Sequence, residues 1–193
     1  MSQGFAFGEI RNAFAVPDSE GNPDGQVYTV FDTSSNIIEL PKHIYADYVD
    51  GLFFSAGLLG TGSEATEKGG MVAQCGQYPE LHFMFSNTWI TVDPKDYVVD
   101  ISDSQDGSLC QVLIGETDKP FISMGLPMFK GYYTIFSDDR GEMGFATTKN
   151  SSKNGPYPGA VPSKDLNVAV PPSARVSGPF VDPDAAAKEA ITS

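Results

Sequence analysis

Residues 27–45 read VYTVFDTSSNIIELPKHIY, and two changes of pattern in this stretch decide the fold. Its first part is rich in aromatic and β-branched residues, which predicts a strand from Val27 that leads to Asp32. Its last part predicts a helix between Pro41 and Leu52, because Pro suits the first helical turn and apolar residues then recur at helical spacing. Five side chains carry that spacing: Ile44, Tyr45, Tyr48, Val49 and Leu52.

Short runs of Thr, Val, Ile, Tyr and Phe elsewhere alternate with polar residues between Gly, Pro, Asn and Asp, as is typical of strands. We therefore predict a mostly β, largely antiparallel domain with a second short helix at Pro127–Lys130. The predicted strands are Phe5–Ile10, Val27–Asp32, Met71–Gln74, Leu81–Phe85, Ile90–Val92, Tyr97–Ile101, Gln111–Ile114, Tyr132–Ser137 and Met143–Ala146. The predicted core side chains are Leu40, Ile44, Phe83, Tyr132, Ile135, Phe136 and Phe145.

Further motifs follow the opening stretch in a definite order. Cys75 precedes the run YPELHFMF, DPKDYVV precedes Cys110, and SMGLPMFKGYYTIFSDDRGEMGFA closes the series. In order and spacing these motifs resemble the C-terminal lobe of pepsin-like aspartic peptidases, from Phe5 to Ala146. The resemblance implies a single lobe of an acid-protease β-barrel with one or two short helices, which is one half of a two-lobed enzyme.

The resemblance places one catalytic position in this chain, Asp32, in a loop that faces a cleft, with Thr33, Ser34 and Ser35 beside it. In the family, two aspartates, one from each lobe, share a proton and activate water between them. The 193 residues contain no other Asp followed by Thr or Ser and then Gly, so the resemblance implies half of a dyad. Ser34 stands where the family has Gly, and Asn36 stands where it has Ser.

Two hypotheses about function stay open on this basis. The chain is either a degenerate peptidase lobe, inactive alone and kept as a structural or interaction subunit of a larger assembly, or half of an active aspartic endopeptidase. In the second case an N-terminal-lobe chain or homodimerisation completes the enzyme. An inhibitor or carbohydrate-binding module on the same fold is a third alternative. The substitutions at Ser34 and Asn36 favour the degenerate lobe, in which Asp32 is an ancestral turn residue.

The two cysteines, Cys75 and Cys110, match the paired cysteines of the family lobe. The resemblance implies a disulfide that closes a loop of about 35 residues, and the alternative is two buried free thiols. A disulfide implies an oxidising compartment, whether secretory, vacuolar, an organelle lumen or the intermembrane space. Since no signal peptide is visible after Met1, we expect an earlier start of the precursor or an import signal of another kind.

Composition excludes several classes of function. The chain holds 25 acidic and 12 basic residues, for a formal charge of -13, so we expect no nucleic-acid partner. No run of 18 apolar residues occurs, so we expect no direct membrane span. We expect neither a metal nor another cofactor, because His43 and His82 are far apart and no βαβ unit surrounds the glycines Gly60 and Gly62.

The composition changes after Thr148. Residues 149–193 contain 7 of the 14 prolines and few large apolar side chains, whereas 21 of the 25 acidic residues fall in residues 1–148. We therefore divide the chain into a peptidase-like lobe, 1–148, and a Pro-rich extended tail that attaches the lobe to other protein chains. The apolar residues expected to make those contacts are Tyr157, Val161, Leu166, Val168 and Phe180.

Overall fold

The structure, a computed structural model, describes residues 1–8, 13–16, 26–58, 63–66, 69–102, 109–149 and 156–159. Within these ranges the chain is mostly β, with short strands and three helices. None of these three helices has both the length and the apolar character needed to cross a membrane. Several predicted positions lie outside the described residues, namely Ile10, Gly60, Gly62, Val161, Leu166, Val168 and Phe180.

The largest sheet is antiparallel and has the strand order β15-β8-β7-β1-β2. Its strands are β1 (Ser2–Phe7), β2 (Phe14–Ala15), β7 (Leu81–Phe85), β8 (Thr88–Val92) and β15 (Tyr157–Pro158). Ser86 and Asn87 form the turn between β7 and β8, and both have positive φ, 46° and 61°. Tight two-residue hairpin turns require this conformation because it matches the twist of the flanking strands.

A second sheet, in the order β11-β4-β12-β3, flanks the loop that contains Asp32. Its strands are β3 (Thr29–Phe31), β4 (Ile38–Pro41), β11 (Ile114–Thr117) and β12 (Ile122–Met124). Strand β12 pairs parallel with β3 and antiparallel with β4, and β11 pairs parallel with β4. The prediction of a largely antiparallel domain is confirmed for the described strands, and the two parallel pairs of this sheet are the exception, because the residue pattern of a short strand does not encode its direction.

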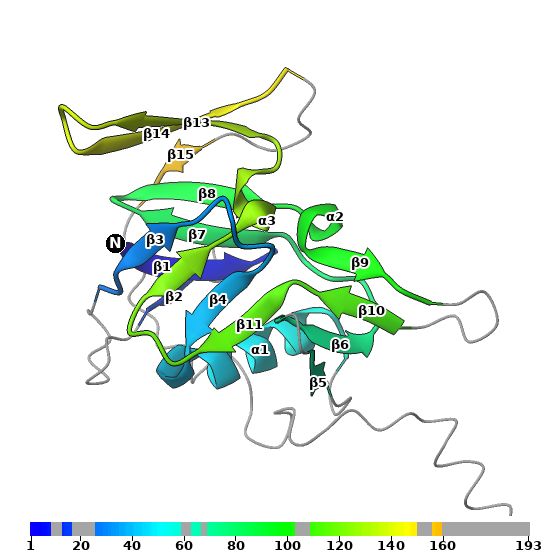
Figure 1. Ribbon diagram of the computed structural model, residues 1–193. Coiled ribbons are helices and arrows are strands. Elements are labelled where there is room, and N and C mark those ends of the chain that lie inside the picture. The colour runs from blue at the N-terminus through cyan, green and yellow to red at the C-terminus, as the bar shows by residue number, and fades with distance from the viewer. Residues whose placement is uncertain are drawn as a thin grey trace, which may run out of the picture.

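The remaining strands form a four-stranded sheet, β5-β6-β10-β9, and a separate hairpin, β13-β14. Their bounds are β5 (Glu64–Ala65), β6 (Met71–Gln74), β9 (Val98–Asp100), β10 (Leu109–Val112), β13 (Tyr132–Ser137) and β14 (Glu142–Thr147). The helices are α1 (Lys42–Ser55), α2 (Pro94–Tyr97) and α3 (Leu126–Phe129). Figure 1 shows α1 and the β13–β14 hairpin on opposite sides of the sheets.

Two of the three helices match the sequence predictions to within a few residues. Helix α1 begins just after Pro41, and α3 contains Pro127 in its first turn. Helix α2 was not predicted, because its last residue, Tyr97, was assigned to the strand that follows. Pro94 at the start of α2 was the available signal, since proline is tolerated in the first turn of a helix.

The core lies between α1 and the sheets, and Tyr48 of α1 is at its centre. Its ring packs edge-on against Phe5 and Phe7, at centroid distances of 4.8 and 4.9 Å, and stacks on Phe83. The predictions of a buried Leu40, Ile44, Phe83 and Tyr132 are confirmed. Burial of such apolar side chains supplies most of the stability of a domain of this size.

The predicted burial of Ile135 and Phe136 is wrong, since 60% and 61% of their surface is exposed. Both residues lie on β13, and the β13–β14 hairpin pairs with no other strand of the described residues. Phe145, on β14, is partly buried against the core. Ile135 and Phe136 are consecutive and point to opposite faces of β13, and their apolar character does not show whether either face is covered within the same chain.

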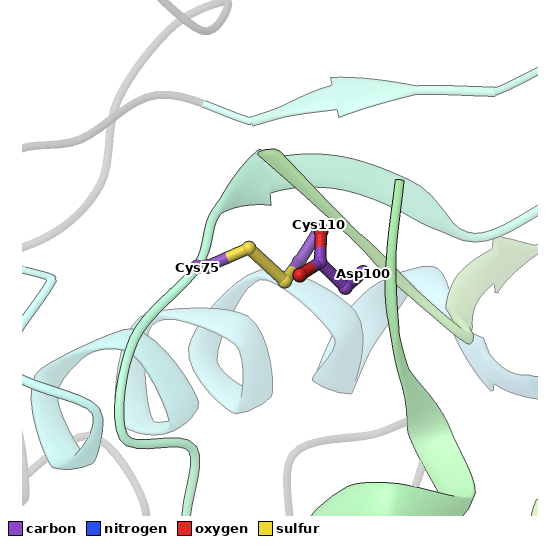
Figure 2. Close-up of side chains that lie close together, drawn as sticks. All are labelled: Cys75, Asp100 and Cys110. Atoms are coloured by element: carbon purple, nitrogen blue, oxygen red, sulfur yellow. A yellow bond between two sulfur atoms is a disulfide. The ribbon is translucent and has the colours of Figure 1, made fainter. Parts of the chain in front are cut away.

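Cys75 and Cys110 form a disulfide, as the family resemblance implied, with their Cα atoms 5.0 Å apart. The bond links the residue after β6 to β10, and those two strands are already paired. Asp100 is the partner of Cys110 in the neighbouring pair of strands, so its carboxylate lies close to the two sulfur atoms (Figure 2). The three side chains have metal-ligand chemistry, but a disulfide leaves no thiolate for a metal.

We expect the double variant Cys75→Ala/Cys110→Ala to lose about 3 to 4 kcal/mol of unfolding free energy, because the bridge restricts the unfolded chain across a separation of 35 residues. Equilibrium urea unfolding of the 193-residue chain and of the variant measures the difference. Two alkylated cysteines in the native protein without reductant would contradict the bridge.

His82 joins three strands through buried hydrogen bonds. Its Nε2 lies 2.9 Å from the carbonyl oxygen of Gly8, at the end of β1, and its Nδ1 lies 2.9 Å from Oγ1 of Thr91 on β8. A carbonyl only accepts, so Nε2 holds the proton and Nδ1 accepts from the threonine hydroxyl. The N–H of Thr91 donates in turn to the hydroxyl of Tyr132 (3.1 Å).

Burial lowers the pKa of His82 below its usual 6.5. The hydrogen bond to the Gly8 carbonyl and the charges of Glu80 and Asp93 raise this pKa, but they offset only part of the effect of burial. The folded state then binds fewer protons than the unfolded state, so this part of the stability is present above pH 6.5 and is lost as the pH falls below it. We expect the unfolding free energy to decrease from pH 7 to pH 5, and the His82→Gln variant to show a flatter dependence.

The exposed His43 is the matched control for this titration. His43→Gln should keep the pH dependence of the parent chain, as measured by urea unfolding at a series of pH values. An equal slope in the parent chain and in His82→Gln would show that His82 does not cause the dependence.

Candidate active-site loop

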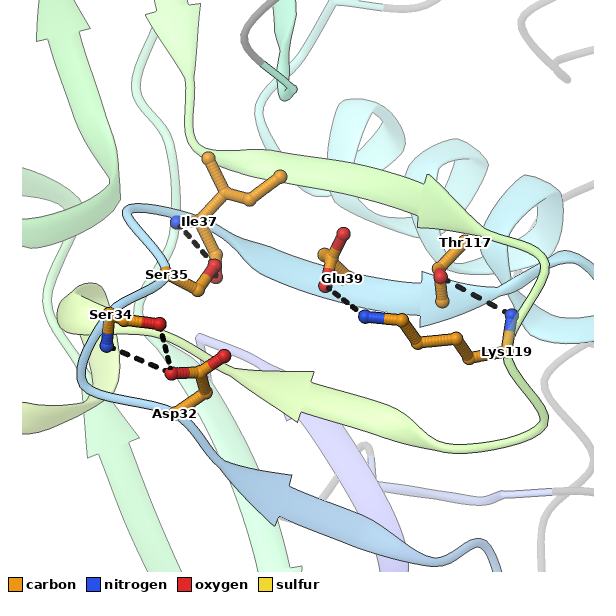
Figure 3. A network of polar contacts seen from close by, with 7 residues as sticks. All are labelled: Asp32, Ser34, Ser35, Ile37, Glu39, Thr117 and Lys119. Carbon is orange, nitrogen blue, oxygen red and sulfur yellow. Dashed lines mark hydrogen bonds and ion pairs between the residues drawn. The ribbon is translucent and has the colours of Figure 1, made fainter.

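Asp32 begins the loop between β3 and β4, and the end of β12 holds this loop in place. The N–H of Asp32 donates to the carbonyl of Met124 (2.9 Å), and the carbonyl of Ser35 accepts from the N–H of Leu126 (2.8 Å). Both ends of the loop are therefore tied to consecutive parts of the chain, the last residue of β12 and the first residue of α3. Figure 3 shows the loop and the strands that flank it.

Gly125 lies directly beneath the loop and separates β12 from α3. A Cβ atom at this position would lie 2.6 Å from the carbonyl oxygen of Ser35 and still closer to that of Ile37. Both neighbours are backbone atoms, which cannot rotate away as a long side chain can. Only glycine permits so close an approach here, and the position of Asp32 therefore depends on Gly125.

One oxygen of the Asp32 carboxylate accepts two hydrogen bonds from Ser34. The backbone N–H of Ser34 lies 2.9 Å from Oδ1, and its hydroxyl lies 2.6 Å from the same oxygen (Figure 3). Ser34 is the residue that replaces the family's glycine, so the substitution adds a donor at the carboxylate. The second carboxylate oxygen is not engaged by Ser34.

These contacts lower the pKa of Asp32 below its usual 3.8. The hydroxyl and then the N–H of Ser34 make the largest contributions, the charge of Lys119 and the N–H of Ser35 add to them, and partial burial opposes them. Hydrogen bonds and a nearby cation stabilise the charged form. The side chain is therefore an ionised carboxylate at neutral and mildly acid pH.

The other predicted site residues lie nearby but do not contact the carboxylate with their side chains. The hydroxyl of Ser35 donates to the carbonyl of Ile37 (3.0 Å) and accepts from its N–H (3.3 Å), so it closes the loop on itself. Thr33 and Asn36 are exposed. The catalytic roles expected for Asp32, Thr33, Ser34 and Ser35 stay predictions.

Sequence reasoning did not identify Lys119 as part of this region. Its Nζ lies 3.7 Å from a carboxylate oxygen of Glu39 on β4, and its backbone N–H donates to Oγ1 of Thr117 (3.3 Å). The residue comes from the turn between β11 and β12, which the sequence separates from Asp32 by more than 80 positions. No local motif marked it, because only the pairing of β12 with β3 and β4 brings this turn close.

A cavity of about 500 Å³ opens beside Phe31, the residue before Asp32. Phe85 and Phe145 close on Phe31, with ring centroids 5.3 and 5.6 Å away. The cavity lies between the β7–β8 hairpin and β14, and Asp32 itself does not line it. This cavity, which has both polar and apolar lining residues, is therefore distinct from the surface that presents the carboxylate.

The family model for eukaryotic aspartyl proteases matches residues 14–148. This match covers most of the chain, and the chain belongs to the eukaryotic aspartyl protease family. The mostly β fold is consistent with a single pepsin-like lobe. Comparison with curated proteins gives no significant match. The disulfide and the family together fit an oxidising, secretory-type compartment.

We expect Ser34→Ala to raise the pKa of Asp32 towards its usual value, because the variant keeps the backbone N–H bond but loses the bond from the hydroxyl. Ser35→Ala is the matched control, since the Ser35 hydroxyl bonds Ile37 and not Asp32. Carboxyl carbon NMR of the labelled chain follows the titration. An unchanged pKa of Asp32 in Ser34→Ala would show that the hydroxyl does not stabilise the ionised carboxylate.

Proposed function

We propose that the lobe formed by residues 1–148 does not hydrolyse peptides by itself and acts as a structural or interaction lobe in a larger assembly. The observation that carries this proposal is the environment of Asp32. Ser34, Ser35 and Lys119 set its pKa, and no carboxylate of the described residues is among these groups. The family's reaction uses two carboxylates, and Asp32 supplies one of them.

Peptide hydrolysis by this chemistry needs two protonation states at once. One carboxylate must be ionised to take a proton from water, and a second must be protonated to donate to the substrate. Asp32 favours the ionised role, because the hydrogen bonds from Ser34 and the charge of Lys119 lower its pKa. The acid must then come from a group that the described part of the lobe does not place beside Asp32.

The exposed face of the β13–β14 hairpin supports a role in assembly. Tyr133 and Ile135, which share one face of β13, are 70% and 60% exposed, and Phe136, on the opposite face, is 61% exposed. A two-stranded hairpin with an uncovered apolar face is marginal in water, and such patches mark interaction sites. We propose that a complementary lobe or another protein chain covers this face.

The tail is the second proposed attachment to other chains. Of its expected contact residues, Tyr157 is paired through its backbone with Trp89 of the same chain. A role for the more distant residues Val161, Leu166, Val168 and Phe180 remains part of the proposal.

A second function, half of an active aspartic endopeptidase, is favoured by one observation. The Asp32 carboxylate is accessible and held ionised at the end of β3, with one oxygen not engaged by Ser34. A partner lobe or a second copy that brought a protonated carboxyl group alongside would complete the pair.

An acid proteolysis assay on the 193-residue chain tests the proposal. We expect no cleavage of an unfolded protein substrate, because one carboxylate cannot serve as both base and acid. We also expect no binding of pepstatin-type inhibitors, which the family binds between its two aspartates. Cleavage that depends on protein concentration and disappears in Asp32→Asn would instead establish the active homodimer. Asp47→Asn, on the partly buried surface of α1, is the control for a nonspecific effect of charge removal.

A further inference from the structure

The Cys75–Cys110 disulfide has a carboxylate beside it, that of Asp100. Strand β10 carries Cys110, and the residue opposite it on β9 is Asp100. The N–H of Ile101 donates to the carbonyl of Leu109 (3.1 Å), so these two residues form a hydrogen-bonded pair. The adjacent pair, Cys110 and Asp100, is then of the other kind, in which the side chains of an antiparallel ladder approach each other more closely.

The Asp100 carboxylate is close to both sulfur atoms of the bridge. One of its oxygens and the two Sγ atoms all lie within 4.8 Å of one another (Figure 2). Cys110 is buried, with 5% of its surface exposed, whereas Cys75 is partly exposed and Asp100 is exposed. A reagent in solution therefore reaches Cys75 more easily than Cys110, and the carboxylate is near either point of attack.

Ser102 orients this carboxylate and keeps it charged. The N–H of Ser102 donates to Oδ1 of Asp100 (2.9 Å), and the hydroxyl of Ser102 accepts from the N–H of Leu109 (3.1 Å), the residue before Cys110. The hydroxyl and then the N–H of Ser102 lower the pKa of Asp100 below its usual 3.8, and desolvation opposes them. Asp100 is therefore negatively charged at neutral and mildly acid pH.

No cation of the surrounding sheet offsets this charge. The strands β5, β6, β9 and β10 contain neither lysine nor arginine. None of the groups that shift the pKa of Asp100 is a cation, in contrast to Asp32, to which Lys119 contributes. Within the described part of this sheet, the sulfur atoms therefore face a negative charge that is not neutralised.

This charge opposes the chemistry that opens a disulfide. A thiolate attacks one sulfur atom, a new S–S bond forms as the old one breaks, and the electron pair leaves on the other sulfur. Attack on Cys75 makes Cys110 the leaving thiolate, and attack on Cys110 makes Cys75 the leaving thiolate. Both routes develop negative charge on sulfur atoms that lie within 4.8 Å of the carboxylate oxygen, and like charges at that distance repel.

We propose that the Asp100 carboxylate protects the Cys75–Cys110 bridge by electrostatic repulsion, because it slows the attack of thiolates. The slowed reaction transfers two electrons and two protons from a dithiol, which closes to a cyclic disulfide, to the bridge, which opens to two thiols. The bridge spans 35 residues and stabilises the folded lobe. Its slower loss therefore extends the lifetime of the fold in the presence of thiols.

The test measures reduction of the folded 193-residue chain by three dithiols of different charge: anionic dihydrolipoate, neutral dithiothreitol and cationic dithiobutylamine. Alkylation at successive times, followed by mass measurement, gives the rate at which the bridge is lost. We expect dithiothreitol to reduce Asp100→Asn faster than the parent chain, on the order of tenfold, as for charges this close near a protein surface. The ratio of the two rates should be larger with dihydrolipoate and smaller with dithiobutylamine.

The variants separate charge from structure. Asn at position 100 keeps an oxygen that accepts from the N–H of Ser102. Asp100→Glu keeps the charge, so its reduction rate should stay close to that of the parent chain. Asp139→Asn removes the same charge from an exposed turn of the β13–β14 hairpin, which belongs to a different sheet, and should also leave the rate unchanged. Urea unfolding measures the stability of each variant.

Equal rates in the parent chain and in Asp100→Asn would overturn the proposal. A ratio of rates that is the same for all three dithiols would also overturn it, because a loosened structure admits every reagent alike. Rates that do not depend on the dithiol concentration would do so as well, since reduction would then follow unfolding of the chain.

Discussion

The crossing of two backbone segments at Gly125 is the constraint on which the site depends. The carbonyl oxygens of Ser35 and Ile37 occupy the space that a side chain at this position would need. Strand β12 reaches this point with β3 on one side and β4 on the other, so the loop between those strands has to pass over its end. Backbone bonds at Met124 and Leu126 then fix the loop, and Asp32 is presented at a defined place.

Within that frame, Ser34 sets the chemical state of the carboxylate. In the family pattern this position is a glycine, which offers only its N–H. Here the hydroxyl adds a second and shorter bond to the same oxygen, 2.6 Å against 2.9 Å. The substitution does not prevent the loop from forming, because the side chain points at Asp32 and not at the backbone of Gly125. It does bias Asp32 towards the ionised form, so the acid in any dyad would have to be its partner.

Helix α1 and the β13–β14 hairpin lie on opposite sides of the sheets. Helix α1 buries its apolar face against the sheets on one side, and the hairpin and β15 lie on the other (Figure 1). A cavity with both polar and apolar lining residues is formed there by Phe145 of β14 and Pro156, which precedes β15, among others. The exposed Ile135 and Phe136 point to opposite faces of β13, which lies on this side of the molecule, away from the helical side of the core.

The sequence by itself determined the class of the fold, and its resemblance to the family implied the disulfide that the structure shows between Cys75 and Cys110. Helical spacing after Pro41 and the ordered motifs that resemble the family are properties of the chain that need no coordinates. Only the tertiary structure decided which apolar residues face the core, since Ile135 and Leu40 have the same chemistry but only Leu40 is covered. It also decided the proximity of Lys119 to Asp32, because this depends on how β12 pairs with β3 and β4. Strand direction arises from how distant segments pack together, and a local residue pattern does not contain it.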